Sequence, residues 1–388
     1  MSRWSATLIK SVAAVFCIYF FFTIVVTDRH AYGSTQDLIR ASRHRLTEDT
    51  TYDHIKNETL GFEKIYAIGL KERTDKRDFL TLAASVHGMK VKWLDGVRPE
   101  SLVEKALPEK FDISFWKPTV AACWRAHMNA LRDVVENGYG TALIMEDDAD
   151  WDVSVREQLR EFARGVRTLS DNPNPSKDAP YGTNWDMLWV GGCASGAADN
   201  ETDIYAIPDD PTVPSVKHRG TWGGPSDGWK AKHPELPEDS TRYIYRANMG
   251  CCLYGYAVTL EGARRILAAL SVDYLDMPVD NAMSDLCAGK NRPHLRCYAP
   301  FPNLIGTYKP AGGRSRDSDI ETYDDGDYHP AMSWNMVYST RLNIHRLVAK
   351  DDTIYSQWQE TDHPWSKKKV KLGDMEYPGG FLVPDQDQ

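Results

Sequence analysis

An acidic cluster directly follows an apolar segment near the middle of the chain. Residues 142–145 are apolar, and the next five positions contain four carboxylates, those of Glu146, Asp147, Asp148 and Asp150. Carboxylates this close repel one another unless a positive charge lies among them. Oxygen ligands of this kind suit Mg²⁺ or Mn²⁺, which also bind substrate phosphates. We therefore predict a divalent-metal site held by Asp148 and Glu146. The alternative is a solvated acidic turn in which Asp148 or Asp150 caps the next helix.

The first elements that position this cluster have a strand–helix–strand pattern. Residues 64–68 and 90–94 have strand patterns, and the segment between them predicts a helix that begins at Thr74 and stops before Gly88. This order is typical of a βαβ unit, and βαβ units build parallel sheets.

A second helix and strand lead into the cluster itself. The helix begins near Thr119, has apolar residues at three- and four-residue steps, and ends at Gly138, before the strand at 141–145. The chain is therefore predicted to be an α/β protein with a mostly parallel, Rossmann-like sheet flanked by helices. In open sheets of this class, ligands bind outside the carboxyl ends of the strands, which is where Glu146 stands.

The alternating pattern continues after the cluster. Ser154 and Glu157 have the form of a capping box that opens a helix through Leu169. Strands are predicted at residues 185–190 and 251–258, and a helix follows the second of them.

The segment between residues 193 and 240 has a different composition. It is rich in Pro, Gly, Asp and Trp and has no periodicity, which predicts a long loop. Within it, Trp222 and Trp229 offer flat faces suited to sugar rings, the alternative for both being core packing.

The N-terminus predicts a membrane anchor. Residues 11–27 carry no charge and approach the ~20 residues that span a ~30 Å hydrocarbon layer. Arg3 and Lys10 precede this segment and Asp28 follows it, so the positive-inside rule places the short tail in the cytosol. We interpret the segment as a type II signal anchor rather than a cleaved signal peptide, because it is longer than a usual h-region.

This topology predicts five regions and a compartment. They are a cytosolic tail (1–10), the transmembrane anchor (11–27), a polar stem (28–60), a folded domain (61–348) and a C-terminal extension (349–388). The body is expected in the lumen of the Golgi, with the endoplasmic reticulum as the alternative. The sequons at Asn57 and Asn200 agree with a lumenal body.

The cysteine count bears on the state of the thiols, and the net charge bears on the possible partners. Apart from Cys17 in the anchor, six cysteines remain, which fits either disulfides or buried free thiols. The net charge of −9 repels phosphate backbones, so nucleic acid is not an expected partner.

Several segments together resemble glycosyltransferase family 25, which includes lipopolysaccharide and collagen hydroxylysine galactosyltransferases. Residues 65–70 with Arg73 and Arg77 resemble its "INLxxRxxR" start, and residues 142–148 resemble its "ALIxEDD" segment. Further matches are residues 122–127 to "GCxxSH", 185–188 to the following strand, 252–263 to "xYxxxxxGA" and 278–280 to "PVD". The chain departs from the pattern at three positions, with Gly69 for Asn, Ala122 for Gly and Ala126 for Ser.

The resemblance implies a GT-A fold and a hexosyltransferase. It implies a UDP-sugar donor, a divalent metal in many members and inversion at the anomeric carbon, with galactose or glucose passed to a glycan or glycoprotein. A metal on Asp148 and Glu146 would stabilise the departing diphosphate. Four residues would bind the donor, namely Arg73, Arg77, Glu146 and Asp147. The two arginines would contact its phosphate or ribose, the alternative for both being ordinary surface charge.

The same resemblance offers a catalytic base. An inverting transfer needs a group that takes the proton of the acceptor hydroxyl, and Asp280 of the "PVD" match is the candidate. The alternative is that Asp280 caps the following helix, with Asp276 or Asp285 nearer the acceptor. His127 is interpreted as a structural, hydrogen-bonded side chain.

Two other classes of function remain open. A metal-dependent phosphoesterase could use the same acidic cluster, but the sequence shows no second Asp/His cluster of the kind it needs. A catalytically inactive sugar-binding module is the other class, suggested by the departures at Gly69 and Ala126.

Overall fold

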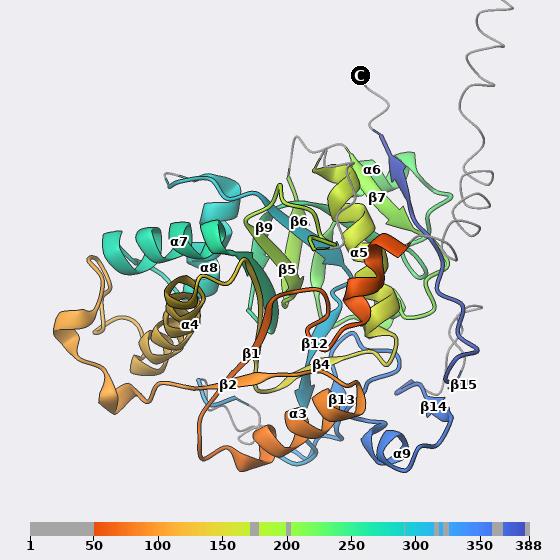
Figure 1. Cartoon of the computed structure of the whole chain (residues 1–388), viewed down its shortest axis with the longest axis horizontal. Helices are drawn as coiled ribbons and strands as arrows, with labels where there is room; N and C mark the ends of the chain where they lie inside the picture. Colours follow the sequence, from red (N-terminus) through yellow and green to blue (C-terminus); the bar gives the residue numbers. More distant parts are fainter. Residues whose placement is uncertain are drawn as a thin grey trace, which may run out of the picture.

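A mixed β-sheet forms the centre of the protein (Figure 1). The structure, a computed structural model, describes residues 50–170, 178–198, 203–290, 292–313, 318–320, 326–358 and 368–384. The strands follow the order β16-β7-β9-β11-β5-β10-β3-β1-β2. They are β1 (Lys64–Gly69), β2 (Lys92–Asp95), β3 (Thr141–Glu146), β5 (Met187–Gly191), β7 (Ile204–Ile207), β9 (Arg242–Cys251), β10 (Gly255–Thr259), β11 (Cys297–Phe301) and β16 (Phe381–Val383).

Most strands of this sheet run in one direction. β1, β2, β3, β5, β7 and β11 point one way, and β9, β10 and β16 point the other way. The predicted α/β class with a mostly parallel sheet is confirmed. The departure from a purely parallel order is clearest at β10, which lies antiparallel between β3 and β5.

Shorter strands extend this framework. β6 (Ala194–Ala197) pairs with β9 and with β8 (Trp222–Gly224) at the side of the main sheet. A small second sheet contains β4 (Ala149–Trp151), β12 (Ile305–Lys309) and β13 (Met332–Ser333), and a two-stranded ribbon contains β14 (Thr353–Tyr355) and β15 (Lys369–Lys371). The second sheet begins immediately after the acidic cluster, so it holds the chain on the far side of Asp148.

Helices cover both faces of the sheet (Figure 1). The α-helices are α3 (Thr74–Val86), α4 (Pro118–Asn137), α5 (Val155–Leu169), α6 (Asp227–Lys232), α7 (Leu260–Leu267), α8 (Val279–Ala288) and α9 (Ile344–Val348). The remaining helical turns are η1 (Thr50–Lys56), η2 (Pro99–Ser101), η3 (Glu104–Ala106), η4 (Val216–His218) and η5 (Ala268–Asp273).

Alternation along the strands divides the core into two layers. In β1, Tyr66 and Ile68 pack in the layer formed with α4, α7 and α8, whereas Ile65 and Ala67 pack in the layer formed with α3 and α5. Successive strand side chains point to opposite faces, so a strand covered by helices on both sides must be apolar throughout. Each fully buried side chain, such as Leu131 of α4, contributes about 1.5–3 kcal/mol to folding.

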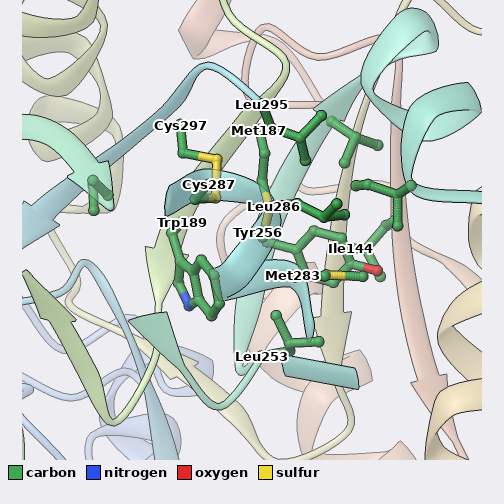
Figure 2. Close-up of a cluster of buried hydrophobic side chains, with 14 of the residues drawn as sticks. Ile144, Met187, Trp189, Leu253, Tyr256, Met283, Leu286, Cys287, Leu295 and Cys297 are labelled. Atoms are coloured by element: carbon green, nitrogen blue, oxygen red, sulfur yellow. A yellow bond between two sulfur atoms is a disulfide. The ribbon is translucent and has the colours of Figure 1, made fainter. Parts of the chain in front are cut away.

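A disulfide lies within the core layer that is formed with α4, α7 and α8 (Figure 2). It joins Cys287 at the end of α8 to Cys297 at the start of β11, among buried side chains that include Met187, Trp189 and Leu286. The second disulfide joins Cys193 to Cys252, while Cys123 and Cys251 are free among the described residues. The six cysteines thus include both of the forms that the sequence left open.

The predicted helices are confirmed, but the capping hydrogen bond predicted at the start of α5 is absent. α4 ends at Gly138, whose φ of 68° is the left-handed conformation that glycine adopts without strain. At α5, the N-cap residue is Ser154 as predicted, but its side chain makes no capping hydrogen bond. Its hydroxyl contacts the Met375 sulfur instead, because the start of α5 is buried against the C-terminal segment.

The segment predicted as a long loop forms part of the sheet. It contains β6, β7, β8 and α6, and every residue of β7 is buried. A buried ion pair also fixes it, since Arg242 Nε lies 2.7 Å from Asp210 Oδ2. Sequence periodicity could not show this, because β7 spans only four residues. The predicted strand at 251–258 is divided into the end of β9 and β10, with Cys252 between them at a φ of 60°.

Packing extends beyond the predicted domain boundaries at 61 and 348. In η1, Tyr52 and Ile55 are buried and belong to the core beside α5, and β16 pairs with β7 near the other end of the chain.

The predicted anchor at 11–27 lies outside the described residues. Within the described ranges, no helix has both the length and the apolar character needed to cross a membrane.

Asp152, just before α5, is expected to make stability depend on pH. Its carboxylate accepts hydrogen bonds from the amides of Ser154 (3.1 Å) and Tyr338 (2.8 Å), and burial raises its pKa to about 7, from 3.8. A raised carboxyl pKa means that the unfolded state binds fewer protons between these values, so this group's contribution to stability is lost as pH rises from about 4 through 7.

The Asp152→Asn variant removes that titration. Relative to the variant, the wild type should lose unfolding free energy between about pH 4 and about pH 7, measured by urea unfolding of both proteins. The variant also loses one hydrogen-bond acceptor, which shifts its unfolding free energy at every pH. The test is therefore whether the difference in unfolding free energy between wild type and variant changes with pH. A difference that stays constant across this range would contradict the raised pKa.

Candidate active site

A cavity of about 140 Å³ opens where β1, β2 and β3 end. These three strands are parallel, so their carboxyl ends meet at one edge of the sheet. The cavity is lined by residues of the β1 and β2 ends, by one face of α4, and by Glu146, Asp147 and Asp148. The acidic cluster therefore lies at the edge where open α/β sheets bind their ligands.

A buried lysine lies against the acidic cluster. Lys76 Nζ is 3.0 Å from Asp147 Oδ1, 3.8 Å from Asp148 Oδ2 and 2.9 Å from Asp319 Oδ2. Burial lowers the pKa of Lys76, but the three carboxylates outweigh this effect and the pKa stands above its ordinary value. Lys76 is therefore a fixed positive charge. It supplies part of the neutralisation that the sequence analysis assigned to a metal ion alone.

Asp147 is buried in the cavity wall, and its position explains one departure from the family 25 pattern. Burial raises its pKa to about 6, with Lys76 opposing the shift and Asp148 adding to it. A Cβ atom at position 69 would meet the Asp147 carboxylate well inside van der Waals contact. Gly69 is therefore required by this placement of Asp147, whereas the family 25 pattern that the sequence resembles has Asn at that position.

Asp148 has a carboxylate oxygen that can still accept a hydrogen bond or bind a cation. Its Oδ1 atom is buried and has no hydrogen-bond partner among the described residues, while its side chain is 14% exposed and lines the cavity. A buried carboxylate oxygen without a partner is costly. Lys76, Arg73 and Arg341 offset part of the negative charge here, but they are outnumbered by the five carboxylates around them, those of Glu146, Asp147, Asp148, Asp150 and Asp319. The oxygens of Asp148, together with Glu146 in the same wall, fit a divalent cation such as Mg²⁺ or Mn²⁺.

Asp150 is structural. Its fully buried carboxylate accepts hydrogen bonds from the Ser333 hydroxyl (2.7 Å), the Ser339 hydroxyl and the amides of Trp151 (2.8 Å) and Arg341 (3.1 Å). Neither it nor Asp148 caps α5. The alternative of a solvated acidic turn is therefore wrong, because tertiary contacts bury Asp147 and Asp150.

Arg73 and Arg77 are engaged with other groups. Arg73 pairs with Asp75 at 2.8 Å and with Asp319 at 2.5 Å. Arg77 donates to the carbonyl oxygens of Gly69 (3.0 Å) and Leu70 (3.2 Å) at the end of β1. The cavity wall contains neither arginine and contains Lys76 instead. A usable signal was present, since Lys76 follows Arg73 at the three-residue spacing of the "RxxR" pattern.

Asp280 holds the chain at the Cys193–Cys252 disulfide. It is the second residue of α8, whose N-cap is Pro278, so the predicted capping role is wrong. Its Oδ2 atom accepts a hydrogen bond from the Cys252 amide at 2.8 Å. Burial raises the pKa of the Cys123 thiol, and both Glu146 and Asp280 add to the shift. The cavity wall contains Glu146 and Cys123 but not Asp280.

His127 is a buried, hydrogen-bonded side chain, as interpreted from the sequence. It is 2% exposed, its Nδ1 lies 3.2 Å from the Tyr256 hydroxyl, and its Nε2 lies 3.5 Å from Glu146 Oε1.

The two candidate acceptor tryptophans have different surroundings. Trp229 packs against His233 and Tyr243 and belongs to the edge of the core, whereas Trp222 is 64% exposed. Only Trp222 therefore presents a free face of the kind that sugar rings stack on.

Sequence reasoning missed three residues around the cluster, namely Lys76, Asp319 and Arg341. Arg341 is buried and donates to the Asp147 carbonyl oxygen at 2.6 Å. Asp319 and Arg341 lie far from the cluster in sequence, and no local pattern marks them.

Comparison with known proteins identifies distant relatives of one kind. No protein-family model matches the chain. Procollagen galactosyltransferase 1 of Danio rerio is 22% identical over 334 residues, covering 79% of this chain and 46% of the relative. Procollagen galactosyltransferase 1-B of Xenopus laevis is 19% identical over 316 residues (76% and 44%), and procollagen galactosyltransferase 2 of Homo sapiens is 19% identical over 326 residues (79% and 44%). The chain is a distant homologue of procollagen galactosyltransferases.

This homology supports a glycosyltransferase enzyme and agrees with the family 25 resemblance. The chain spans less than half the length of these curated relatives.

Proposed function

We propose that the protein transfers a hexose, galactose or glucose, from a UDP-sugar to a hydroxyl group of a glycan or glycoprotein. The transfer is inverting and metal-assisted, and it takes place in the cavity at the ends of β1, β2 and β3. The observation that carries this proposal is the buried, unpartnered Oδ1 atom of Asp148 in the wall of that cavity. Distant homology to procollagen galactosyltransferases supports the reaction class.

The residues have separate roles in this reaction. Asp148 and Glu146 hold the divalent metal, which when bound supplies positive charge for the departing diphosphate. Lys76 offsets part of the negative charge of the cluster and presents a fixed cation beside the diphosphate. Arg77 braces the end of β1 through its two carbonyl contacts, and Arg73 braces Asp319. Both arginines thus act on the donor site through the backbone and side chains that they hold.

Asp280 is the base in this proposal. It takes the proton of the acceptor hydroxyl as that oxygen attacks the anomeric carbon from the face opposite the leaving diphosphate. The hydrogen bond from the Cys252 amide to Oδ2 fixes the carboxylate in place.

Nucleotide release from a panel of nucleotide sugars tests the function. Purified protein is incubated with each sugar, with and without candidate glycan or glycoprotein acceptors, in the presence of Mn²⁺ or Mg²⁺. Release of UDP with sugar appearing on an acceptor is the expected result. Hydrolysis of simple phosphodiesters would favour the phosphoesterase instead, and binding without release would favour an inactive sugar-binding module.

As part of the same proposal, the folded domain lies in the Golgi lumen and a type II anchor holds it to the membrane. Two disulfides within the described residues support an oxidising compartment. The first sequon lies at an exposed turn after η1, where Asn57 Oδ1 accepts a hydrogen bond from the Thr59 amide at 2.8 Å.

Glycosylation of Asn57 is the expected consequence. Glycosidase treatment of the expressed protein should increase its mobility in gels, and the shift should shrink in Asn57→Gln and disappear when Asn200→Gln is added. An unglycosylated body that protease reaches in sealed microsomes would contradict the lumenal topology.

A further inference from the structure

A second set of potential metal ligands lies in the cavity wall beside the acidic cluster. Cys123 and His127 are four residues apart on α4, so their side chains share one helix face, and Glu146 ends β3 opposite them. The sulfur, imidazole nitrogen and carboxylate oxygen of these three residues lie within 4.8 Å of one another.

The geometry is close to that of a tetrahedral zinc site. Metal–ligand distances of ~2.0–2.3 Å place neighbouring ligand atoms about 3.3–3.6 Å apart. His127 Nε2 and Glu146 Oε1 are already 3.5 Å apart. Shifts of about 1 Å would bring the third donor, Cys123 Sγ, to the same ion.

The surroundings of His127 fit a metal ligand. Its Nδ1 is engaged with the buried Tyr256 hydroxyl at 3.2 Å, which leaves Nε2 directed at Glu146. A hydrogen bond to the other ring nitrogen is the usual way in which proteins orient a histidine ligand. Helix α4 and strand β3 belong to the packed core, so they provide a rigid support for the site.

We propose that Cys123, His127 and Glu146 form a site for Zn²⁺ or a similar borderline-soft divalent ion. On binding, the Cys123 thiol releases its proton to solvent and its sulfur forms the bond to the ion. The thiolate and the carboxylate then balance the charge of the ion within a partly buried wall. Three protein ligands leave a fourth position open to the cavity. This donor set differs from the all-carboxylate set of Asp148 and Glu146, which suits Mg²⁺ and Mn²⁺.

The shared Glu146 couples the two sites. A Zn²⁺ ion bound by Cys123 and His127 takes Glu146 away from Asp148, so Zn²⁺ inhibits sugar transfer; this consequence rests on the proposed function. Binding of the ion itself does not, because it needs neither donor nor acceptor.

Cobalt substitution tests the site directly. Purified full-length protein, kept free of reductant so that its disulfides stay intact, is titrated with Co²⁺ and then with Zn²⁺. A thiolate-to-cobalt charge-transfer absorption is expected, and Zn²⁺ should abolish it by displacement. Cys123→Ser should lose this absorption and bind Zn²⁺ at least about tenfold more weakly, since losing even an outer-shell partner costs 10–100-fold.

The other free thiol provides the matched control. Cys251 lies beside the Cys193–Cys252 disulfide, whose sulfurs are already bonded, so Cys251→Ser should keep the cobalt absorption. Absence of the charge-transfer band in the wild type would overturn the proposal, as would equal Zn²⁺ affinity in Cys123→Ser with an unchanged melting temperature. If the band is present but no nucleotide sugar is used, the transferase proposal fails and the metal site stands.

Discussion

Asp148→Asn is expected to lower the rate of sugar transfer by about 10²–10³-fold, the usual cost of removing one stabilising group for a developing negative charge. Asn keeps the shape of the side chain but removes the charge that the divalent metal requires. Folding should change little. The Asp148 carbonyl oxygen, which accepts from the Tyr308 amide at 2.8 Å, is unaffected, and Lys76 keeps its closer contacts to Asp147 and Asp319.

Initial rates at saturating donor, with and without chelator, provide the measurement. Asp227→Asn is the matched control, because it removes the same charge from a fully exposed position at the start of α6. The control should transfer sugar at the wild-type rate and lose that activity in chelator. Full turnover in both chelator-treated wild type and Asp148→Asn would show that no metal acts at this site.

Asp280→Asn is expected to lower kcat by ~10²–10⁴-fold and to leave UDP affinity unchanged. The amide oxygen of Asn can still accept the hydrogen bond from Cys252, so the loop at the disulfide keeps its position. Asn cannot take a proton from the acceptor. The N-cap of α8 is Pro278, so the substitution removes no cap and the melting temperature should stay close to that of the wild type.

Asp285→Asn on the same helix tests one of the two alternatives to Asp280 that the sequence left open, the other being Asp276. Asp285 lies 3.9 Å from Lys290, and its side chain is 30% exposed. If Asp280 is the base, only Asp280→Asn loses turnover; if the losses are exchanged between the variants, Asp285 is the base. A product with retained anomeric configuration would contradict a single displacement, whichever residue is changed.

Part of this site could be predicted from the sequence because its determinants are local. The apolar residues before Glu146 specify a strand buried on both faces, and the amphipathic pattern before Gly138 specifies α4. A strand that follows a crossover helix is parallel to its predecessor, so its end must lie at the same sheet edge. That chain of reasoning places Glu146 to Asp148 in the cavity without any knowledge of side-chain contacts.

The partners of those carboxylates were decided by tertiary structure. Lys76 lies between Asp147 and Asp319, and the second of these is 243 positions away along the chain. The periodicity of a sequence cannot show such a pairing, because it does not tell whether a lysine on a helix is exposed to solvent or buried against carboxylates from distant segments. The same holds for Asp280, whose partner is the amide of Cys252, and for Asp150, whose hydroxyl partners come from residues 333 and 339.

The sequence by itself determined the sheet edge at which the carboxylates gather, the resemblance to family 25 and the elements that lead to this edge, namely β1, α3, β2, α4 and β3. Each of these depends on side-chain period or on neighbouring residue types, which the order of residues contains directly. Only the tertiary structure decided which carboxylate keeps an unpartnered oxygen, that β10 runs against its neighbours, and that Cys193 pairs with Cys252 rather than with the adjacent Cys251. These outcomes depend on burial and on contacts between distant segments, where a charge or thiol takes its role from the groups that surround it.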